Sequence, residues 1–229
     1  MCTVTYLPIG DSDFILTSNR DEQPSRETIE PTNYVEDGVI LTYPKDKLAG
    51  GTWIGLSEKN RLVCLLNGGF ESYERKASYR MSRGIIVKAV LKSDDFEKYI
   101  STFDFNGIEP FTIVLVDWNS GLKTYELVWD GKQQYFSKLK NEPKIWSSST
   151  LYTQEEKELR KSWFANWLEN QSKITQEGIL KFHQNSEIGT PENSIKMKRS
   201  YVETVSITSV KKESENVSLK YDNLIEHKR

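Results

Sequence analysis

Short segments rich in β-branched and aromatic residues recur along most of the chain, and turns rich in Gly, Pro, Asn or Asp separate them. Segments of this kind, with apolar and polar residues in alternation, are typical of β-strands. The pattern predicts strands over residues 2–7, 14–20, 37–43, 52–57, 61–67, 111–118, 122–130, 133–139, 144–149, 202–210 and 216–223. Runs of strands interrupted by helices favour an α+β fold with mainly antiparallel sheets.

Helical periodicity is found in three regions of the chain. Residues 82–103 are expected to hold two helices divided near Ser93, a natural N-cap that acidic residues follow directly. Residues 153–171 form the clearest helix, and residues 175–185 form a short further segment.

The predicted helix over residues 153–171 has both a start signal and an apolar face. Thr153 and Glu156 have the spacing of a capping box. Its apolar stripe at helical spacing consists of Leu159, Trp163, Phe164, Trp167 and Leu168. A chain of 229 residues, 11% of them aromatic, can bury a sizeable core, so we expect one domain over residues 1–229, with helices packed outside two stacked sheets.

Composition excludes several classes of protein. The formal net charge of −2 provides no basic field that would attract nucleic acid. No apolar run approaches the roughly 18 residues of a membrane span, and the N-terminus lacks the pattern of a signal peptide, so a cytoplasmic protein is expected. His183 and His227 have no suitably spaced partners, so no metal site is expected. The oligomeric state is left open.

The two cysteines have different settings in the sequence. Cys64 lies inside a predicted strand and is expected to be a small buried apolar residue. Cys2 directly follows the initiator methionine. Once Met1 is removed, Cys2 has a thiol and a free α-amine, which are a nucleophile and a base in one residue.

The first predicted hairpin brings polar residues to the start of the chain. Its turn centres near residues 10–11, so the numbers of paired residues sum to about 21 and Cys2 faces roughly Asn19. Arg20 would then lie close to the thiol, where its charge favours the thiolate and lowers the thiol pKa. The carboxylate of Asp21 could orient the α-amine.

The second predicted hairpin has its turn near residues 58–59, which places Asn67 opposite about Gly50. Gly50 and Gly51 would let the backbone approach a ligand closely. A side-chain amide beside exposed backbone amides has the makeup of an oxyanion hole. This corner is therefore the second candidate for a catalytic site. Trp53, which follows the two glycines, is expected to pack in the core and to form part of a pocket wall.

Six stretches of the sequence occur in a characteristic order: MC, SNRDE, GGTWIG, LLNGG, WSSSTLY and ETVS, from Cys2 to Ser206. Together they resemble the NRDE family, the family of the Transport and Golgi organisation protein 2. The resemblance implies a relation to N-terminal nucleophile hydrolases of the bile-salt hydrolase and penicillin V acylase type. It also implies their four-layer αββα sandwich and their N-terminal cysteine nucleophile.

The resemblance assigns catalytic roles to four residues. Cys2 would be the nucleophile, Arg20 would lie near its thiol and Asp21 near its amine. Asn67 would correspond to the asparagine that holds the oxyanion.

The resemblance further implies a substrate-binding set, which consists of Asn19, Gly51, Thr52, Trp53, Ser148 and Arg199. Ser148 stands where the related hydrolases have an asparagine-bearing stretch, and this departure weighs against catalysis. Arg199 would match an arginine that comes late in those sequences.

Two functions from different classes are compatible with these residues. The first is a cysteine hydrolase or acyltransferase that acts on a linear amide or related acyl compound, that is, on C–N bonds other than peptide bonds. No cofactor is expected for a hydrolase of this kind. The alternative is a non-catalytic protein that binds and delivers haem, an acyl-lipid or acyl-CoA, ligands to which members of the resembled family have been linked. The first needs a processed terminus and a reactive thiol, whereas the second tolerates Cys2→Ala unless the thiol is itself a haem ligand.

Overall fold

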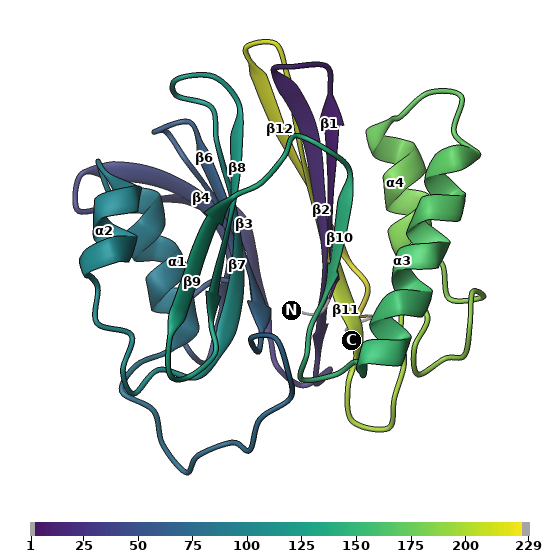
Figure 1. The fold of residues 1–229 in the computed structure, drawn as a ribbon, viewed down its shortest axis with the longest axis horizontal. Coiled ribbons are helices and arrows are strands. Elements are labelled where there is room, and N and C mark those ends of the chain that lie inside the picture. Colours follow the sequence, from purple (N-terminus) through teal and green to yellow (C-terminus); the bar gives the residue numbers. More distant parts are fainter. Residues whose placement is uncertain (1–2, 226–229) are drawn as a thin grey trace. The chain divides into compact units, whose positions relative to one another are not determined.

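Residues 3–225, which the computed structural model describes, form two antiparallel sheets, each within a compact unit of its own. The first unit combines the chain up to Ser25 with the chain from Asn141 onward, and the second is Arg26–Lys140. Within the described residues each sheet has two α-helices (Figure 1). The predicted α+β class with antiparallel sheets is therefore confirmed.

In the described part of the first unit, five strands form a sheet in the order β10-β1-β2-β11-β12. The strands are β1 (Thr3–Ile9), β2 (Asp13–Glu22), β10 (Lys144–Ser147), β11 (Glu203–Glu213) and β12 (Asn216–Asn223). The N-terminal hairpin β1–β2 thus lies in the middle of the sheet, between strands from the C-terminal part of the chain.

The register of the β1–β2 hairpin differs from the prediction by one residue. Thr3, not Cys2, pairs with Asn19. The shift arises because the connecting loop contains residues 10–12, one residue more than the two-residue turn that the prediction assumed. Cys2 lies outside the described residues, so its own pairing stays a prediction.

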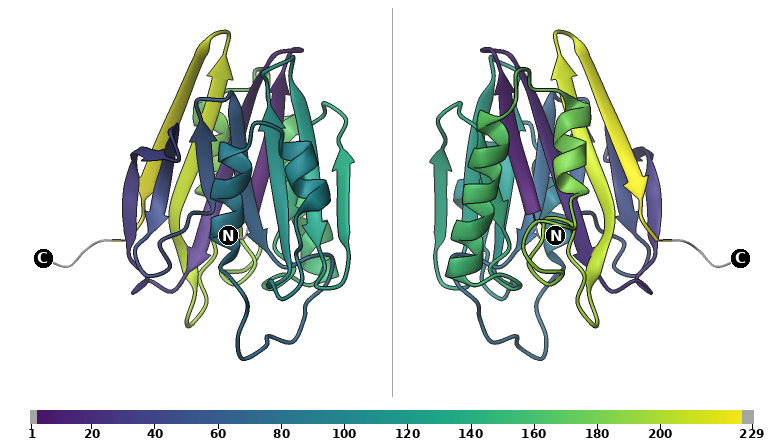
Figure 2. Two further views of the ribbon diagram at one scale, coloured as in Figure 1. Left: turned by 90° about the vertical axis from the view of Figure 1, so that its left-hand side faces the viewer. Right: turned by 90° about the vertical axis from the view of Figure 1, so that its right-hand side faces the viewer.

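Two helices of the described chain, α3 (Gln154–Glu169) and α4 (Gln176–His183), cover one face of this sheet, as the right-hand view of Figure 2 shows. α3 contacts β10, and α4 contacts β2 and β11. α3 begins at the predicted capping box, in which Thr153 and Glu156 exchange hydrogen bonds between side chain and backbone.

The buried face of α3 differs from the predicted stripe at one position. Leu159 is 42% exposed, whereas Arg160 is fully buried. Arg160 lies four residues before the buried Phe164 and therefore shares its face of the helix. Trp163 and Trp167 are partly buried against the same core. A charged side chain thus occupies the inward position that the pattern assigned to a leucine.

The sheet of the second unit is a meander of seven described strands in chain order. The strands are β3 (Thr28–Glu36), β4 (Val39–Asp46), β5 (Ile54–Ser57), β6 (Arg61–Asn67), β7 (Phe111–Asp117), β8 (Lys123–Trp129) and β9 (Gln134–Lys138). The sequence pattern does not predict β3, an edge strand that contains Pro31 and a register irregularity between Ile29 and Thr32. Proline and bulges are both typical of sheet edges.

α1 (Arg83–Lys92) packs on β4, β5 and β6, and α2 (Phe96–Thr102) packs beside α1, as the left-hand view of Figure 2 shows. Ser93 ends α1 as its C-cap and does not start α2. Asp95 caps α2 instead, because its carboxylate accepts the backbone N–H of Lys98 over 2.9 Å. The predicted division near Ser93 is right, and the predicted N-cap is wrong by two residues.

β5 and β6 form the predicted second hairpin, with Ile54 opposite Cys64. Cys64 is fully buried, as expected. Asn67, however, pairs with Phe111 of β7 and not with Gly50. Gly50 closes a turn with a positive φ of 68° after β4 ends, so the β5–β6 ladder does not extend to it.

Candidate functional site

The end of β2 holds the predicted site residues Asn19, Arg20 and Asp21, all of which are buried. Side chains of successive strand residues point to opposite faces of a sheet. Asn19 and Asp21 therefore share the face that α3 and α4 cover, and Arg20 points to the other face. Asn19 lies directly opposite Thr3, the residue that follows Cys2.

The carboxylate of Asp21 accepts hydrogen bonds from two buried hydroxyl groups. Thr204 donates to Oδ1 over 2.7 Å, and Tyr152 donates to Oδ2 over 3.3 Å. The Thr204 oxygen also accepts the backbone N–H of Met197 over 3.0 Å. These two hydroxyls, one on each oxygen, fix the orientation of the carboxylate.

The ring of Tyr152 has two arginines close to it. The guanidinium carbon of Arg160 is 4.1 Å from the ring centroid, and that of Arg199 is 5.5 Å from it. Arg199 also pairs with Glu156 over 3.7 Å. The structure thus brings the predicted residue Arg199 to the same group as Asp21, with Tyr152 as the link between them.

Asn19 uses its side chain inside the first unit. Its amide nitrogen donates to the carbonyl oxygens of Ile195, over 2.8 Å, and His183, over 3.1 Å. Its amide oxygen lies 2.6 Å from Nδ1 of His183, which must therefore carry the proton. Nε2 of His183 then accepts the hydroxyl of Thr5 over 2.8 Å. These bonds tie α4 to the sheet, and a contact of Asn19 with a substrate stays a prediction.

The buried histidine of this network is neutral. Burial lowers the pKa of His183 to about 3, and the positive charge of Arg160 adds to this effect. Both ring nitrogens of this histidine are engaged, with Asn19 and Thr5, so within the described structure the ring serves to hold α4 on the sheet.

Ser148 directly follows β10 and is buried. Its hydroxyl lies 2.8 Å from that of Thr150, and its carbonyl oxygen accepts the backbone N–H of Tyr152 over 3.1 Å. Ser148 therefore shapes the turn that brings Tyr152 to Asp21. Its predicted contact with a substrate is not tested by these bonds.

The second unit holds the remaining predicted site residues. The hydroxyl of Thr52 lies 2.7 Å from the carbonyl oxygen of Pro44 and 2.8 Å from that of Ile54, and its one proton can be donated to either. Trp53 is buried. A Cβ on Gly51 would lie 3.1 Å from backbone atoms of Gly84 at the start of α1. The GGTW stretch is thus a tight, well-bonded connection between β4 and β5.

Asn67 is half-buried at the end of β6, and Gly68 follows it with a positive φ of 85°. The turn is fixed by a bond from the Gly68 N–H to the carbonyl of Pro110 over 3.0 Å and by a bond from Thr112 to the Gly68 carbonyl, also over 3.0 Å. The convergence of Asn67 with Arg20 and Asp21 would join residues of both units, and it stays a prediction.

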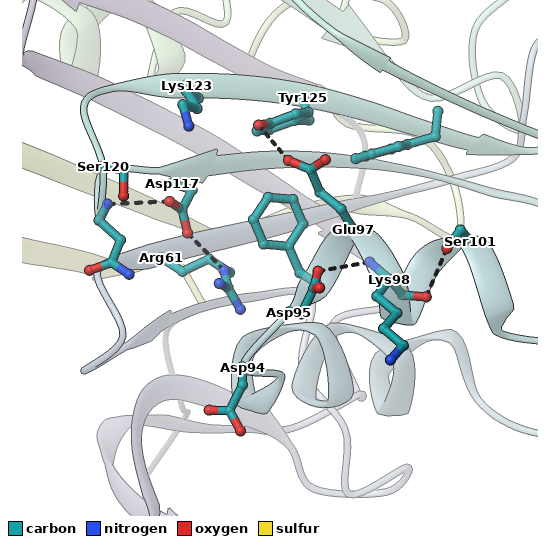
Figure 3. A pocket seen from close by; sticks show the side chains of 13 residues that line it. Arg61, Asp94, Asp95, Glu97, Lys98, Ser101, Asp117, Ser120, Lys123 and Tyr125 are labelled. Carbon is teal, nitrogen blue, oxygen red and sulfur yellow. Dashed lines mark hydrogen bonds and ion pairs between the residues drawn. The ribbon is translucent and has the colours of Figure 1, made fainter.

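A hollow of about 560 Å³ in the second unit is lined by Arg61, Asp94, Asp95, Phe96, Glu97, Lys98, Ser101, Asp117, Asn119, Ser120, Lys123, Tyr125 and Phe136 (Figure 3). Four of its lining residues are joined in two pairs. Arg61 pairs with Asp117 over 3.1 Å, and Tyr125 donates to Glu97 over 2.9 Å. No predicted site residue lines this hollow, so it is separate from the candidate site.

Residues 3–225 contain no group of three His, Cys, Asp or Glu side chains that could hold a metal ion. In the same part of the chain no helix has both the length and the apolar character that a membrane crossing requires.

Three residues of this site are absent from the sequence-based set, namely Tyr152, Arg160 and Thr204. Tyr152 and Thr204 lie within the stretches WSSSTLY and ETVS that carry the family resemblance, so the motifs contain them without singling them out. Arg160 could have been found because it precedes Phe164 by four residues and Trp167 by seven, which places a charge on an apolar face.

Comparison with known proteins places this geometry in context. Residues 1–221 match the sequence model of the family described as Transport and Golgi organisation 2. No curated protein sequence matches the chain.

Three solved structures are similar to this chain. One is an N-acylethanolamine-hydrolyzing acid amidase ortholog of Caenorhabditis elegans, with a TM-score of 0.60 and 13% identity over 91% of this chain and 92% of that chain. Another is penicillin V acylase from Agrobacterium tumefaciens, with a TM-score of 0.53 and 10% identity over 98% and 86%. The third is a variant of the conjugated bile acid hydrolase from Clostridium perfringens, with a TM-score of 0.51 and 11% identity over 97% and 92%. The predicted N-terminal nucleophile hydrolase type of fold is therefore confirmed.

Proposed function

This chain belongs to the Transport and Golgi organisation 2 family, and we propose that it is an N-terminal cysteine hydrolase or acyltransferase acting on a linear amide or related acyl compound. The fold supports the proposal, because the similar structures are those of proteins named as an N-acylethanolamine-hydrolysing amidase, a penicillin V acylase and a bile acid hydrolase. Each of these names describes an acyl group joined to a small molecule.

The observation that carries the proposal is the pairing of β1 with β2. It sets the stretch Asn19, Arg20 and Asp21 beside Thr3, the residue covalently joined to Cys2. A cation and a carboxylate at the start of the chain are what a cysteine with a free α-amine requires. The cation favours the thiolate, and the carboxylate can hold the amine.

The proposed chemistry begins with removal of Met1. The freed α-amine of Cys2 has an ordinary pKa of about 7.7–8.0, so a good fraction is neutral near pH ~7.5 and can take the thiol proton. The thiolate attacks the carbonyl carbon, and Asn67 with a backbone amide stabilises the oxyanion. The protonated amine then gives its proton to the leaving amine. Attack by water, or by another acyl acceptor, releases the acyl group and restores the thiol.

The proposed role of Asp21 is orientation. Its two oxygens are held by Thr204 and Tyr152 on the helix-covered side of the sheet. A carboxylate that cannot rotate provides a fixed acceptor for the N–H groups of the amine.

The test is a search for an acyl-enzyme. The protein with a processed N-terminus is incubated with p-nitrophenyl esters of increasing acyl length, quenched in acid, and analysed by intact-mass and peptide mass spectrometry. We expect one acyl group on the N-terminal peptide of the wild type and of Cys64→Ala, and none on Cys2→Ala. An acyl group on Cys64 alone, or no release of p-nitrophenol above that of Cys2→Ala, would contradict the proposal.

The second candidate function is the non-catalytic carrier of haem or an acyl-lipid. Ser148 favours it, because its hydroxyl is engaged with Thr150 at the place where the resembled hydrolases have an asparagine-bearing stretch. The carrier function would be supported by two results together. Cys2→Ala would bind acyl-CoA or haem with wild-type affinity, and the wild type would form no acyl-enzyme.

A further inference from the structure

Arg160 reaches from α3 to the very start of the described chain. Its Nη2 donates to the hydroxyl of Thr3, and its Nε donates to the hydroxyl of Ser147 over 3.0 Å. Thr3 and Ser147 are direct cross-strand partners on β1 and β10. One guanidinium group therefore joins the first described residue of β1 to the last residue of β10.

The remaining contacts of Arg160 hold it rigidly. Nη1 donates to the carbonyl oxygens of Asn193 and Ser194, both over 2.6 Å, and the guanidinium lies over the ring of Tyr152. The side chain is fully buried. A planar group with donors in a fixed fork can bridge four acceptors in this way, which the point charge of a lysine cannot.

The charge of Arg160 is not neutralised by direct contact. Within residues 3–225 no carboxylate lies in ion-pair distance of it. The ionisable groups around it are the neutral His183 on α4, Asp21 on β2, which Tyr152 links to Arg160, and Arg199, which lies near the same tyrosine ring and pairs with Glu156. Burial of a charge without an ion-pair partner carries a large desolvation free energy. A neutral polar side chain could bridge the same strands with a smaller desolvation free energy.

We propose that Arg160 is the positioning residue of the N-terminal nucleophile, an inference that rests on the proposed function of Cys2. Through Thr3 it fixes the backbone from which Cys2 extends, and through Tyr152 it fixes the hydroxyl that orients Asp21. Its contact with Ser147 also fixes the strand end that leads to Ser148. A single buried side chain thereby sets three segments of the first unit that contribute to the proposed site.

The place at which β1 begins affects the reactivity of Cys2. If β1 begins at a fixed place, the thiol is held where the charge of Arg20 favours the thiolate. If that start is loosened, the thiol pKa rises toward the ordinary value of about 8.5. A rise of about one unit lowers the thiolate fraction at pH 7 about tenfold, and the labelling rate with it.

The test uses two matched substitutions on one strand and one face. Thr3→Val removes the hydroxyl that contacts Arg160, and Thr5→Val removes the hydroxyl that contacts His183. Each removes one buried hydroxyl from β1, so a general loss of stability affects both alike. Thr3→Ser keeps the hydroxyl and should therefore behave like the wild type. Arg160→Gln removes both the positive charge and the planar set of guanidinium donors.

The measurement is the rate of iodoacetamide labelling of Cys2 between pH 5 and pH 10, followed by peptide mass spectrometry. We expect Thr3→Val and Arg160→Gln to label about tenfold more slowly at pH 7, with a profile shifted to higher pH. Thr5→Val and Thr3→Ser should stay within about twofold of the wild type. Equal profiles for Thr3→Val and Thr5→Val would overturn the inference. A wild-type Cys2 no faster than a cysteine in unfolded protein would instead refute the proposed function, so the two failures are distinguishable.

Discussion

Thr204 donates its hydroxyl to Asp21 over 2.7 Å, although 183 residues separate the two in the sequence. The two residues are also cross-strand partners on β11 and β2, next to a register irregularity in β11 between Thr204 and Ser206. Bulges frequently re-aim side chains beside functional sites. The second-last strand of the fold thus determines how a carboxylate near the chain start is oriented.

Replacement of Thr204 tests this orientation. Thr204→Val should lower the free energy of unfolding by about 1–3 kcal/mol, because the backbone N–H of Met197 loses its acceptor and Asp21 loses a donor. Thr204→Ser keeps both bonds and should lose less than about 1 kcal/mol. Urea denaturation followed by tryptophan fluorescence measures both variants. Equal losses for Val and Ser would mean that the methyl group, not the hydroxyl, is what Thr204 contributes.

His183 should make the protein sensitive to acid. Its pKa is about 3 in the folded protein and about 6.5 in an unfolded chain. Below pH 6.5 the unfolded state therefore binds more protons, so stability is present above pH 6.5 and is lost as pH falls toward 3. Between pH 7 and pH 5 this one group should cost about 2 kcal/mol.

The corresponding comparison is between wild type and His183→Gln. Other groups contribute equally to the pH dependence of both proteins, so the difference between their unfolding free energies isolates His183. The variant is expected to be less stable at pH 7, with a flatter dependence on pH between 7 and 5. Parallel curves would show that His183 is not the group that titrates.

Glu109 should anchor the loop that follows Asn67. Its carboxylate accepts the hydroxyl of Tyr73 over 2.8 Å and pairs with Arg83 over 3.1 Å and Arg75 over 3.2 Å. Burial raises the pKa of Tyr73, which therefore stays a donor at neutral pH. In Glu109→Gln we expect backbone hydrogen exchange over residues 70–80 to accelerate about tenfold, the effect of losing a charged hydrogen bond of about 1.5 kcal/mol.

The control for this loop is Glu97→Gln, which removes the charge from the acceptor of the Tyr125 hydroxyl in the same unit. It should leave the exchange of residues 70–80 unchanged. Acceleration in both variants would indicate a general loosening of the second unit and would contradict a specific anchor.

Gly84 should be required for the close approach of α1 to Thr52. A Cβ at this position would lie 2.8 Å from the carbonyl oxygen and 2.9 Å from the nitrogen of Thr52. These are backbone atoms, so Gly84→Ala should lower the free energy of unfolding by about 1–3 kcal/mol, although alanine is the better helix former by about 1 kcal/mol.

The control is Gly178→Ala, where the atom closest to the added Cβ is a side-chain oxygen of Thr175 at 3.2 Å. Thermal denaturation should show a smaller loss of stability for this variant. A more stable Gly84→Ala would disprove the close contact.

Much of the fold follows from local pattern, and the exceptions have identifiable causes. Strands such as β6 and β7 are continuous apolar runs, so their position was predictable. β3 was not, because an exposed edge strand with Pro31 buries too little to show alternation. The register of β1 and β2 depends on one additional loop residue, which composition does not indicate.

The candidate site was predictable only in part. Arg20 and Asp21 follow from hairpin geometry, whereas Tyr152 and Thr204 reach Asp21 through tertiary packing that no local pattern encodes. The spacing of Arg160 from Phe164 and Trp167 places it on the apolar face of α3, but spacing alone does not show that the charge is buried. Its burial depends on acceptors from three separate segments, which only the folded chain brings together.

The most direct test of the account is the rate at which iodoacetamide labels Cys2 and Cys64, measured against pH in three proteins. These are the wild type with Met1 removed, Arg20→Ala with Met1 removed, and a form that retains Met1. In the wild type Cys2 should label much faster than the buried Cys64. Arg20→Ala should slow Cys2 about tenfold at pH 7, and retention of Met1 should slow it as well, because a peptide bond replaces the amine base. Equal rates for Cys2 in all three proteins, or faster labelling of Cys64 than of Cys2, would contradict the N-terminal nucleophile mechanism.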